Sequence, residues 1–243
     1  MRKILLAVLL ISGLVFPKIL LAQNLNVGNP QQKNQGAEKP EEKITNYRVV
    51  SETKGEDGSI TRVVEFKKGN IIVHQTLLLP PMPKIGYHKP IDPDTMNHDS
   101  VMVYIDKANY LLAVIYKRKR IRQYRAVFGP DRLPDKMQEG DRKTPEGWFK
   151  IVAKKYDSRW QRFLLINYPN DSSYARFYRR KRAGWIPQNA QIGGSIGIHG
   201  TYPSGAGMVD LGIGWTDGCI SLKPKDIEDL YRLVWPGTRV YIK

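Results

Sequence analysis

Cysteine is almost absent from the sequence, since Cys219 is the single cysteine among 243 residues. One cysteine cannot form an intramolecular disulfide, so a small disulfide-stapled scaffold is excluded. The 21 glycines and 16 prolines are too few for a collagen-like fibre. A hydrophobic content of 41% with 10% aromatic residues excludes a fully disordered chain. The length therefore allows one or two domains with a hydrophobic core.

Long apolar runs are missing except at residues 4–16, a stretch of 13 residues that is too short to span a membrane comfortably. It follows Arg2 and Lys3 and leads to the small residue Ala22, an order typical of a secretory signal. We expect residues 1–22 to be this signal, with Ala22 the last residue removed. An uncleaved membrane anchor is the alternative. Later apolar runs have the length of strands, so we expect no stable transmembrane span after signal removal and an exported protein of the periplasm or cell envelope.

Acidic residues are in the minority, with 23 Asp and Glu against 39 Lys and Arg, a net charge of +16. Signal removal takes away three basic residues and no acid, which leaves +13. In an exported protein this charge favours wall polymers or anionic membrane surfaces as partners, and nucleic acid is not expected. The basic clusters at residues 117–125 and 179–182 are either solvated faces or binding patches.

The chain divides into four regions by composition. Residues 1–22 are the signal and residues 23–45 a polar, aromatic-free linker. Residues 46–97 form an N-terminal β extension, because three β-branched segments at 47–53, 60–67 and 71–79 are separated by the turn sequences GEDG and KKGN. The fourth region covers residues 98–243.

Short strands dominate the fourth region. They are expected at 101–106, 111–116, 121–128, 148–153, 163–167 and 238–242, and in the glycine-spaced segment IGIHG at 196–200. Residues 169–184 look like a loop that could hold a short helix. One helix is clear, since Ile227, Leu230, Tyr231 and Val234 recur at helical spacing after Pro224. The fold class is therefore mainly β, a sandwich or barrel-like domain, with Trp148 and Trp160 expected in its core.

The sequence has a histidine that could act as the base for the lone thiol. His199 ends a glycine-spaced segment, IGIHG, and TDGCISL follows after a gap of 16 residues. A thiol needs a base to react near neutral pH, and histidine is the natural one. Five glycines in the gap let the chain fold back, and Gly218 allows a tight turn with N–H groups directed at a developing oxyanion. A buried, inert cysteine is the alternative.

Together, IHGT, the gap and TDGCISL resemble the signature of the L,D-transpeptidase (YkuD-type) catalytic domain. GDRKTPEGWFKI and PGTRVYI also resemble segments of that family. The resemblance covers residues 101–243, so it implies that the fourth region, residues 98–243, is the catalytic domain. It also implies a β-sandwich of mixed sheets with one C-terminal helix, here preceded by the small antiparallel meander.

The resemblance also implies roles for individual residues. Cys219 would be the nucleophile, His199 its base, and the Gly200 carbonyl the group that orients the imidazole. The backbone N–H groups of Gly218 and Cys219 would be oxyanion donors. Thr216 matches a Ser or Thr position of the family.

Two positions depart from the family pattern. Asp217 stands where many members have a second histidine, and Ser221 where an Arg or Asn is common. A carboxylate close to a thiol raises the thiol pKa, so Asp217 is expected to point away, pair with a basic side chain or accept a substrate amine. A turn-forming role is equally open. We expect substrate contacts from Tyr202, Trp215, Thr216, Asp217 and Ser221, with core or flap packing the alternative for the two aromatic residues.

The implied reaction is acyl transfer on the stem peptide of peptidoglycan, cut after its third residue. A thioester on Cys219 would pass to an amine, giving a 3–3 cross-link, attachment of a surface protein or D-amino acid exchange. If water takes the thioester, the protein is an L,D-carboxypeptidase or a wall-trimming hydrolase. A non-catalytic wall-binding module is the alternative of another class. No metal or organic cofactor is expected.

Overall fold

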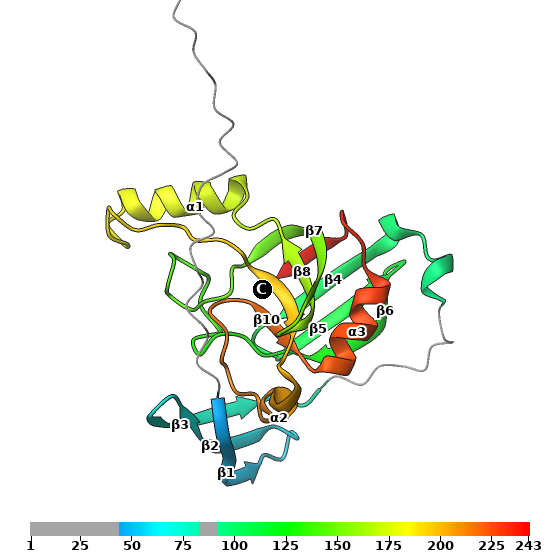
Figure 1. The fold of residues 1–243 in the computed structure, drawn as a ribbon. Helices are drawn as coiled ribbons and strands as arrows, with labels where there is room; N and C mark the ends of the chain where they lie inside the picture. The colour runs from blue at the N-terminus through cyan, green and yellow to red at the C-terminus, as the bar shows by residue number, and fades with distance from the viewer. Residues whose placement is uncertain (1–43, 83–91) are drawn as a thin grey trace, which may run out of the picture. The chain divides into compact units, whose positions relative to one another are not determined.

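A computed structural model describes residues 44–82 and 92–243 (Figure 1). The predicted signal and most of the predicted linker lie outside these residues. In the part that is described, no helix combines the length and the apolar character needed to cross a membrane. Residues Glu42–Lys243 form one compact unit.

The predicted N-terminal meander is confirmed. Strands β1 (Ile44–Lys54), β2 (Ile60–Lys68) and β3 (Ile71–Leu79) form a three-stranded antiparallel sheet in that order. Alternation along β2 and β3 buries Val64, Phe66, Leu77 and Leu79, since successive side chains of a strand point to opposite faces. These four side chains belong to the main hydrophobic core.

Two tyrosines connect β1 to the segment that follows His199 in sequence. The hydroxyl of Tyr202 donates to the carbonyl oxygen of Ile44 over 2.6 Å. The hydroxyl of Tyr47 donates to the carbonyl oxygen of Ser204 over 3.1 Å. The meander is therefore fastened to the chain just beyond the predicted catalytic histidine.

The second sheet is mixed and has eight strands in the order β10-β9-β8-β7-β11-β4-β5-β6. The strands are β4 (Val101–Asp106), β5 (Leu111–Tyr116), β6 (Lys119–Arg125), β7 (Gly147–Asp157), β8 (Gln161–Ile166), β9 (Gly197–Gly200), β10 (Ile220–Leu222) and β11 (Arg239–Ile242). The pairs β9–β10 and β4–β11 are parallel and the others antiparallel. The mainly β class with mixed pairing is as predicted.

The outer strand β10 has a partner on its far side as well. Val127, which follows β6, exchanges two backbone hydrogen bonds with Ser221 of β10, at 2.9 and 2.8 Å. The β10 edge is therefore paired at this point, which holds the segment after Cys219 in place from both sides.

Three α-helices accompany the sheets: α1 (Asp171–Arg182), α2 (Ala206–Leu211) and α3 (Pro224–Leu233). Single 3-10 turns cover Pro93–Thr95, His98–Ser100 and Pro203–Gly205. Helix α3 is the predicted C-terminal helix and buries Ile227, Leu230 and Leu233. Helix α1 occupies residues expected to be mainly loop. Asn170 caps it by accepting a hydrogen bond from the Ser173 N–H over 3.0 Å.

Two expectations about tryptophan positions were wrong in part. The side chain of Trp148 is 53% exposed and packs against Tyr241, so it is not a core residue. Trp160 is half-buried and packs against the core from outside. The strand expected in IGIHG is confirmed as β9 (Gly197–Gly200).

Candidate active site

Strands β9 and β10 bring His199 and Cys219 to one face of the mixed sheet. The parallel register pairs Ile198 with Ile220 and His199 with Ser221. Cys219 directly precedes β10, so an extended chain places it on the same face as Ser221 and His199. The chain reversal predicted from the glycine-rich gap therefore brings the two segments side by side.

The thiol group of Cys219 contacts one backbone group at the start of β9 and one in the segment just before it. The Gly197 N–H donates to Cys219 Sγ over 3.4 Å, and Sγ donates to the Ser195 carbonyl oxygen over 3.7 Å. The first contact can stabilise a thiolate, since a backbone N–H favours an anion. Gly197 is required here, because a Cβ atom on it would lie 2.5 Å from the ring of Phe163.

The His199 imidazole is held in one tautomer. Its Nδ1 lies 2.7 Å from the carbonyl oxygen of Gly200, the contact expected from the sequence. A carbonyl oxygen only accepts, so Nδ1 carries the proton and donates it. The lone pair is then on Nε2, which makes Nε2 the basic nitrogen.

Aromatic rings surround this imidazole and remove it from water. Phe163 stacks on it at 5.8 Å between centroids, with 7° between the planes. Trp160 lies at 5.0 Å and Trp215 meets it edge-on at 5.7 Å. Burial lowers the pKa of His199 to about 4, because the charged form loses its hydration. The imidazole is therefore neutral at pH 7, as a general base must be.

A short turn positions Cys219. The hydroxyl of Thr216 donates to the Cys219 carbonyl oxygen over 2.7 Å and accepts from the Gly218 N–H at 3.3 Å. Gly218 has a φ of +125°, a value that favours glycine. The predicted oxyanion donor at Gly218 thus faces Thr216, so this role requires the N–H to leave the hydroxyl. The oxyanion role of the Cys219 N–H stays a prediction.

The sequence and this geometry agree with a known family. A model of the YkuD L,D-transpeptidase catalytic domain matches residues 100–242. The chain belongs to the YkuD family. No curated protein sequence matches it significantly.

Solved structures of L,D-transpeptidases are similar to this YkuD-family chain at low sequence identity. One from Mycobacterium smegmatis is 12% identical with a TM-score of 0.40, over 81% of this chain and 82% of that one. One from Stackebrandtia nassauensis is 17% identical with a TM-score of 0.37, over 61% and 58%. Mycobacterium tuberculosis L,D-transpeptidase 1 is 12% identical with a TM-score of 0.33, over 75% and 70%.

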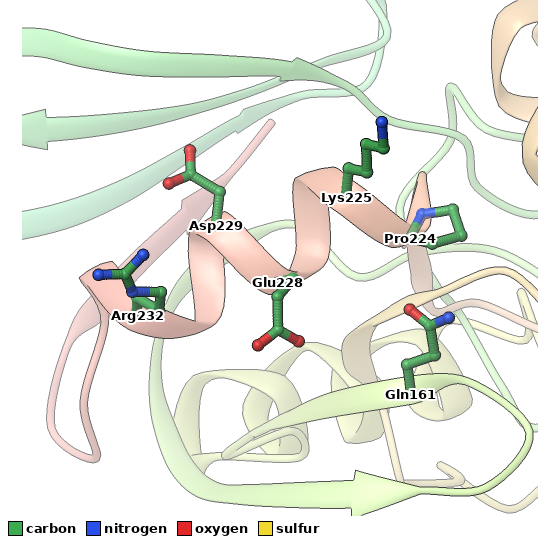
Figure 2. A pocket seen from close by; sticks show the side chains of 6 residues that line it. All are labelled: Gln161, Pro224, Lys225, Glu228, Asp229 and Arg232. Carbon is green, nitrogen blue, oxygen red and sulfur yellow. The ribbon is translucent and has the colours of Figure 1, made fainter.

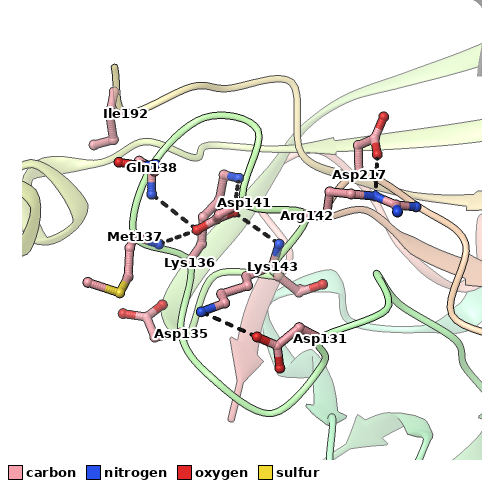
Figure 3. Close-up of polar contacts among 12 residues, drawn as sticks. Asp131, Asp135, Lys136, Met137, Gln138, Asp141, Arg142, Lys143, Ile192 and Asp217 are labelled. Atoms are coloured by element: carbon pink, nitrogen blue, oxygen red, sulfur yellow. Dashed lines mark hydrogen bonds and ion pairs between the residues drawn. The ribbon is translucent and has the colours of Figure 1, made fainter. Parts of the chain in front are cut away.

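Asp217 of this YkuD domain pairs with a basic side chain, one of the arrangements expected from the sequence. Arg142 Nε donates to Asp217 Oδ1 over 2.9 Å (Figure 3). Its Nη2 donates to the Trp215 carbonyl oxygen over 3.2 Å. The Asp217 side chain is 68% exposed and that of Arg142 is 32% exposed. The carboxylate is therefore balanced by a cation and open to solvent.

The other predicted substrate residues are buried. Tyr202 gives its hydroxyl to β1, Trp215 packs on His199, and Thr216 holds the turn. Ser221 is fully buried within β10. Among the five candidates Asp217 alone is exposed. The other four offer a substrate little accessible surface, so their substrate role stays a prediction.

A surface pocket of about 470 Å³ lies along α3 (Figure 2). It is lined by Gln161, Pro224, Lys225, Glu228, Asp229 and Arg232, and by neither Cys219 nor His199. Within residues 44–82 and 92–243, no group of three His, Cys, Asp or Glu residues could hold a metal ion. His98 stacks on Trp235 at 3.4 Å between ring centroids.

Sequence reasoning missed three residues around the site. Phe163 and Trp160 line the imidazole although they lie more than 30 positions before it in sequence, where no local pattern marks them. Arg142 belongs to GDRKTPEG, a segment that resembles the family, but the resemblance predicted no role for its side chain. The available signal was the carboxylate of Asp217 close to the Cys219 thiol in sequence. Such a carboxylate raises the thiol pKa unless a cation balances its charge, so a basic partner for Asp217 could have been predicted.

Proposed function

We propose that this protein is an exported peptidoglycan L,D-transpeptidase with Cys219 as nucleophile and His199 as base. One observation carries the proposal: parallel pairing of β9 with β10 brings the strand of a neutral, single-tautomer imidazole beside the strand that Cys219 directly precedes. An inert buried cysteine needs neither the locked histidine nor the turn at Thr216 that presents it. Membership of the YkuD family supports the same chemistry.

The first half of the reaction forms a thioester. His199 Nε2 takes the proton of the Cys219 thiol, and the thiolate attacks the carbonyl carbon of the third stem residue. The Cys219 N–H stabilises the oxyanion, and the Gly218 N–H joins it once it leaves the Thr216 hydroxyl. The C–N bond to the terminal D-residue then breaks, and its amine departs with the proton from His199.

The second half releases the enzyme. A neutral amine attacks the thioester carbonyl, gives its proton to His199, and displaces the Cys219 thiolate, which is reprotonated. With the side-chain amine of another stem the product is a 3–3 cross-link. An amine of a surface protein or a free D-amino acid completes the same step. The aromatic rings around His199 keep the imidazole neutral, so it accepts a proton in both halves.

Product analysis tests the proposal. The purified protein is incubated with a disaccharide-tetrapeptide and the products are weighed by mass spectrometry. A cross-linked dimer is expected, and Cys219→Ala should abolish it. A tripeptide monomer alone would show hydrolysis rather than transfer. An unchanged substrate with both proteins would contradict enzymatic activity and favour a wall-binding module.

Export is tested separately. We expect the protein recovered from the cell envelope to begin at Gln23, one residue after Ala22. A chain that retains Met1 and stays with the membrane would show that the N-terminal segment is an uncleaved anchor.

A further inference from the structure

Arg142 and Asp217 form an exposed ion pair at the edge of the nucleophile turn. Asp217 lies two positions before Cys219, so their Cα atoms are at most about 7 Å apart. The guanidinium and carboxylate meet over 2.9 Å, with 32% and 68% of their side chains exposed. A cation and an anion are thus presented together beside the reacting thiol.

The backbone that carries Arg142 is rigidly fixed. The Asp141 carboxylate accepts hydrogen bonds from Lys136 Nζ at 2.8 Å and from the N–H groups of Met137, Gln138 and Lys143 at 2.6, 3.1 and 3.0 Å (Figure 3). Four donors on one carboxylate hold the loop in a single conformation, since each is a charge-assisted bond.

Arg142 itself has a left-handed backbone. Its φ is +56°, a conformation that is unfavourable for a residue other than glycine. An exposed ion pair contributes little stability, so the pair alone does not offset this cost. Left-handed residues of this kind persist where the surrounding structure imposes them, commonly at ligand sites.

Both partners retain binding capacity. A guanidinium has five N–H donors, of which Nε and Nη2 use one each, with Asp217 and Trp215. The described residues give the remaining donors no partner. Asp217 uses Oδ1 for Arg142, and its carboxylate is largely exposed. A ligand can therefore place an anion on Arg142 and a cation on Asp217 without breaking the existing pair.

We propose that Arg142 and Asp217 recognise the zwitterionic end of the donor stem's third side chain, in which an ammonium and a carboxylate share one carbon. The inference rests on the proposed function, because the carbonyl of that third residue must reach Cys219. A diamino dicarboxylic acid such as diaminopimelate has this end group. Lysine has the ammonium alone, and the side-chain amide of diaminopimelate lacks the carboxylate. The pair thus selects the third residue of the substrate.

The test compares three disaccharide-tetrapeptides that differ only in the third residue: diaminopimelate, its side-chain amide and lysine. Release of the terminal D-residue is measured, because this first half-reaction depends on the donor alone. The wild type should prefer diaminopimelate by about 10- to 100-fold in kcat/KM, the value of one or two charge-assisted hydrogen bonds. Arg142→Gln should bring all three substrates to within about threefold of one another. Asp217→Asn should lower kcat/KM for all three, since each carries the ammonium.

A second ion pair supplies the matched control. Arg122 and Asp229 meet over 3.1 Å with 33% and 40% exposure, on β6 and α3. Arg122→Gln and Asp229→Asn should leave the preference intact. The ratio of kcat/KM between two substrates does not change when a fraction of the molecules is unfolded. Loss of this ratio therefore reports recognition rather than stability.

Three outcomes would overturn the assignment. The first is equal turnover of the three donors by the wild type, and the second is a preference that survives Arg142→Gln. The third is a preference that appears only when the acceptor stem is varied against a fixed donor, which would place the zwitterion on the acceptor. If no donor loses its terminal residue and Cys219→Ala behaves as the wild type, the proposed function itself fails, a result distinct from equal turnover.

Discussion

The hydroxyl of Thr216 donates a hydrogen bond to the carbonyl oxygen of Cys219 over 2.7 Å. The Thr216 hydroxyl oxygen in turn accepts a hydrogen bond from the Gly218 N–H, so one buried hydroxyl closes the turn that presents the thiol. Thr216 therefore acts on the nucleophile through the backbone and not through the substrate.

Replacing Thr216 by valine should loosen this turn. The hydroxyl is lost at constant shape, and two buried backbone groups lose their partner at a cost of about 1–3 kcal/mol. We expect a lower melting temperature and a lower kcat in product assays. Thr216→Ser keeps the hydroxyl and should restore most of both values. Equal loss in the serine and valine variants would contradict the hydrogen-bonding role.

Replacing Gly218 by alanine should damage activity more than stability. The added Cβ atom would lie 2.7 Å from the Lys143 carbonyl oxygen, at a φ of +125°. The turn must shift, and a displacement near 1 Å at the reacting group can cost about 100-fold in rate. Gly184→Ala is the control, because its φ is +72° and no atom lies within 4 Å of the new Cβ. It should lose about 1 kcal/mol of stability and no activity. Full activity of Gly218→Ala would refute the steric argument.

His199 should make stability depend on pH. Its pKa is about 4 in the folded protein against an ordinary 6.5, so the unfolded chain binds more protons between these values. The free energy of unfolding should therefore fall by about 3 kcal/mol as the pH decreases from 6.5 to 4. Urea unfolding of the wild type and of His199→Asn measures the difference. The asparagine variant should lack this slope, while His74→Asn, at an exposed histidine, should keep it. Identical slopes in all three proteins would show that His199 is not buried as a neutral base.

Removing the Tyr202 hydroxyl should affect stability and leave catalysis unchanged. Its bond to the Ile44 carbonyl oxygen is buried, so Tyr202→Phe should cost about 1 kcal/mol. The kcat/KM should stay within twofold of the wild type, because the hydroxyl faces β1. A large fall in kcat/KM at unchanged stability would instead support the substrate-groove role expected from the sequence.

Strands bounded by strong turns could be predicted closely. Alternating β-branched residues and the turns GEDG and KKGN fixed β1, β2 and β3 to within a few residues. Helix α3 was predicted from the apolar spacing of Ile227 and Leu230 together with Pro224 at its first turn. In these segments the local pattern and the tertiary structure favour the same conformation.

Helix α1 could not be predicted in this way because few of its contacts are apolar. It buries Phe177 and Ser173, and it is fastened largely by arginines. Arg180 pairs with Asp135 over 2.6 Å and donates to the Lys136 carbonyl oxygen over 2.7 Å. Hydrophobic periodicity does not record such contacts. Part of the basic run at 179–182 therefore holds the helix in place, and only the rest of the run is a solvated face.

Those residues of the candidate site that belong to a short sequence motif could be predicted. Those that contact the motif only through tertiary packing could not. Cys219, His199 and Gly200 follow from IHGT and TDGC. The aromatic surroundings of His199 depend on the antiparallel pairing of β8 with β9, which places Phe163 directly opposite His199. Arg142 reaches Asp217 from 75 positions away. No spacing rule in a single sequence links residues that far apart.

Detection of the acyl-enzyme tests the chemistry most directly. The protein is mixed with a tetrapeptide stem, quenched in acid within seconds and weighed intact, and the modified peptide is then located by fragmentation. We expect a mass increase equal to the stem without its terminal residue, carried on Cys219, slower to form in His199→Gln and absent from Cys219→Ala. An unmodified Cys219 in a protein that still converts the stem, or conversion that persists in Cys219→Ala, would contradict a thioester mechanism at this residue.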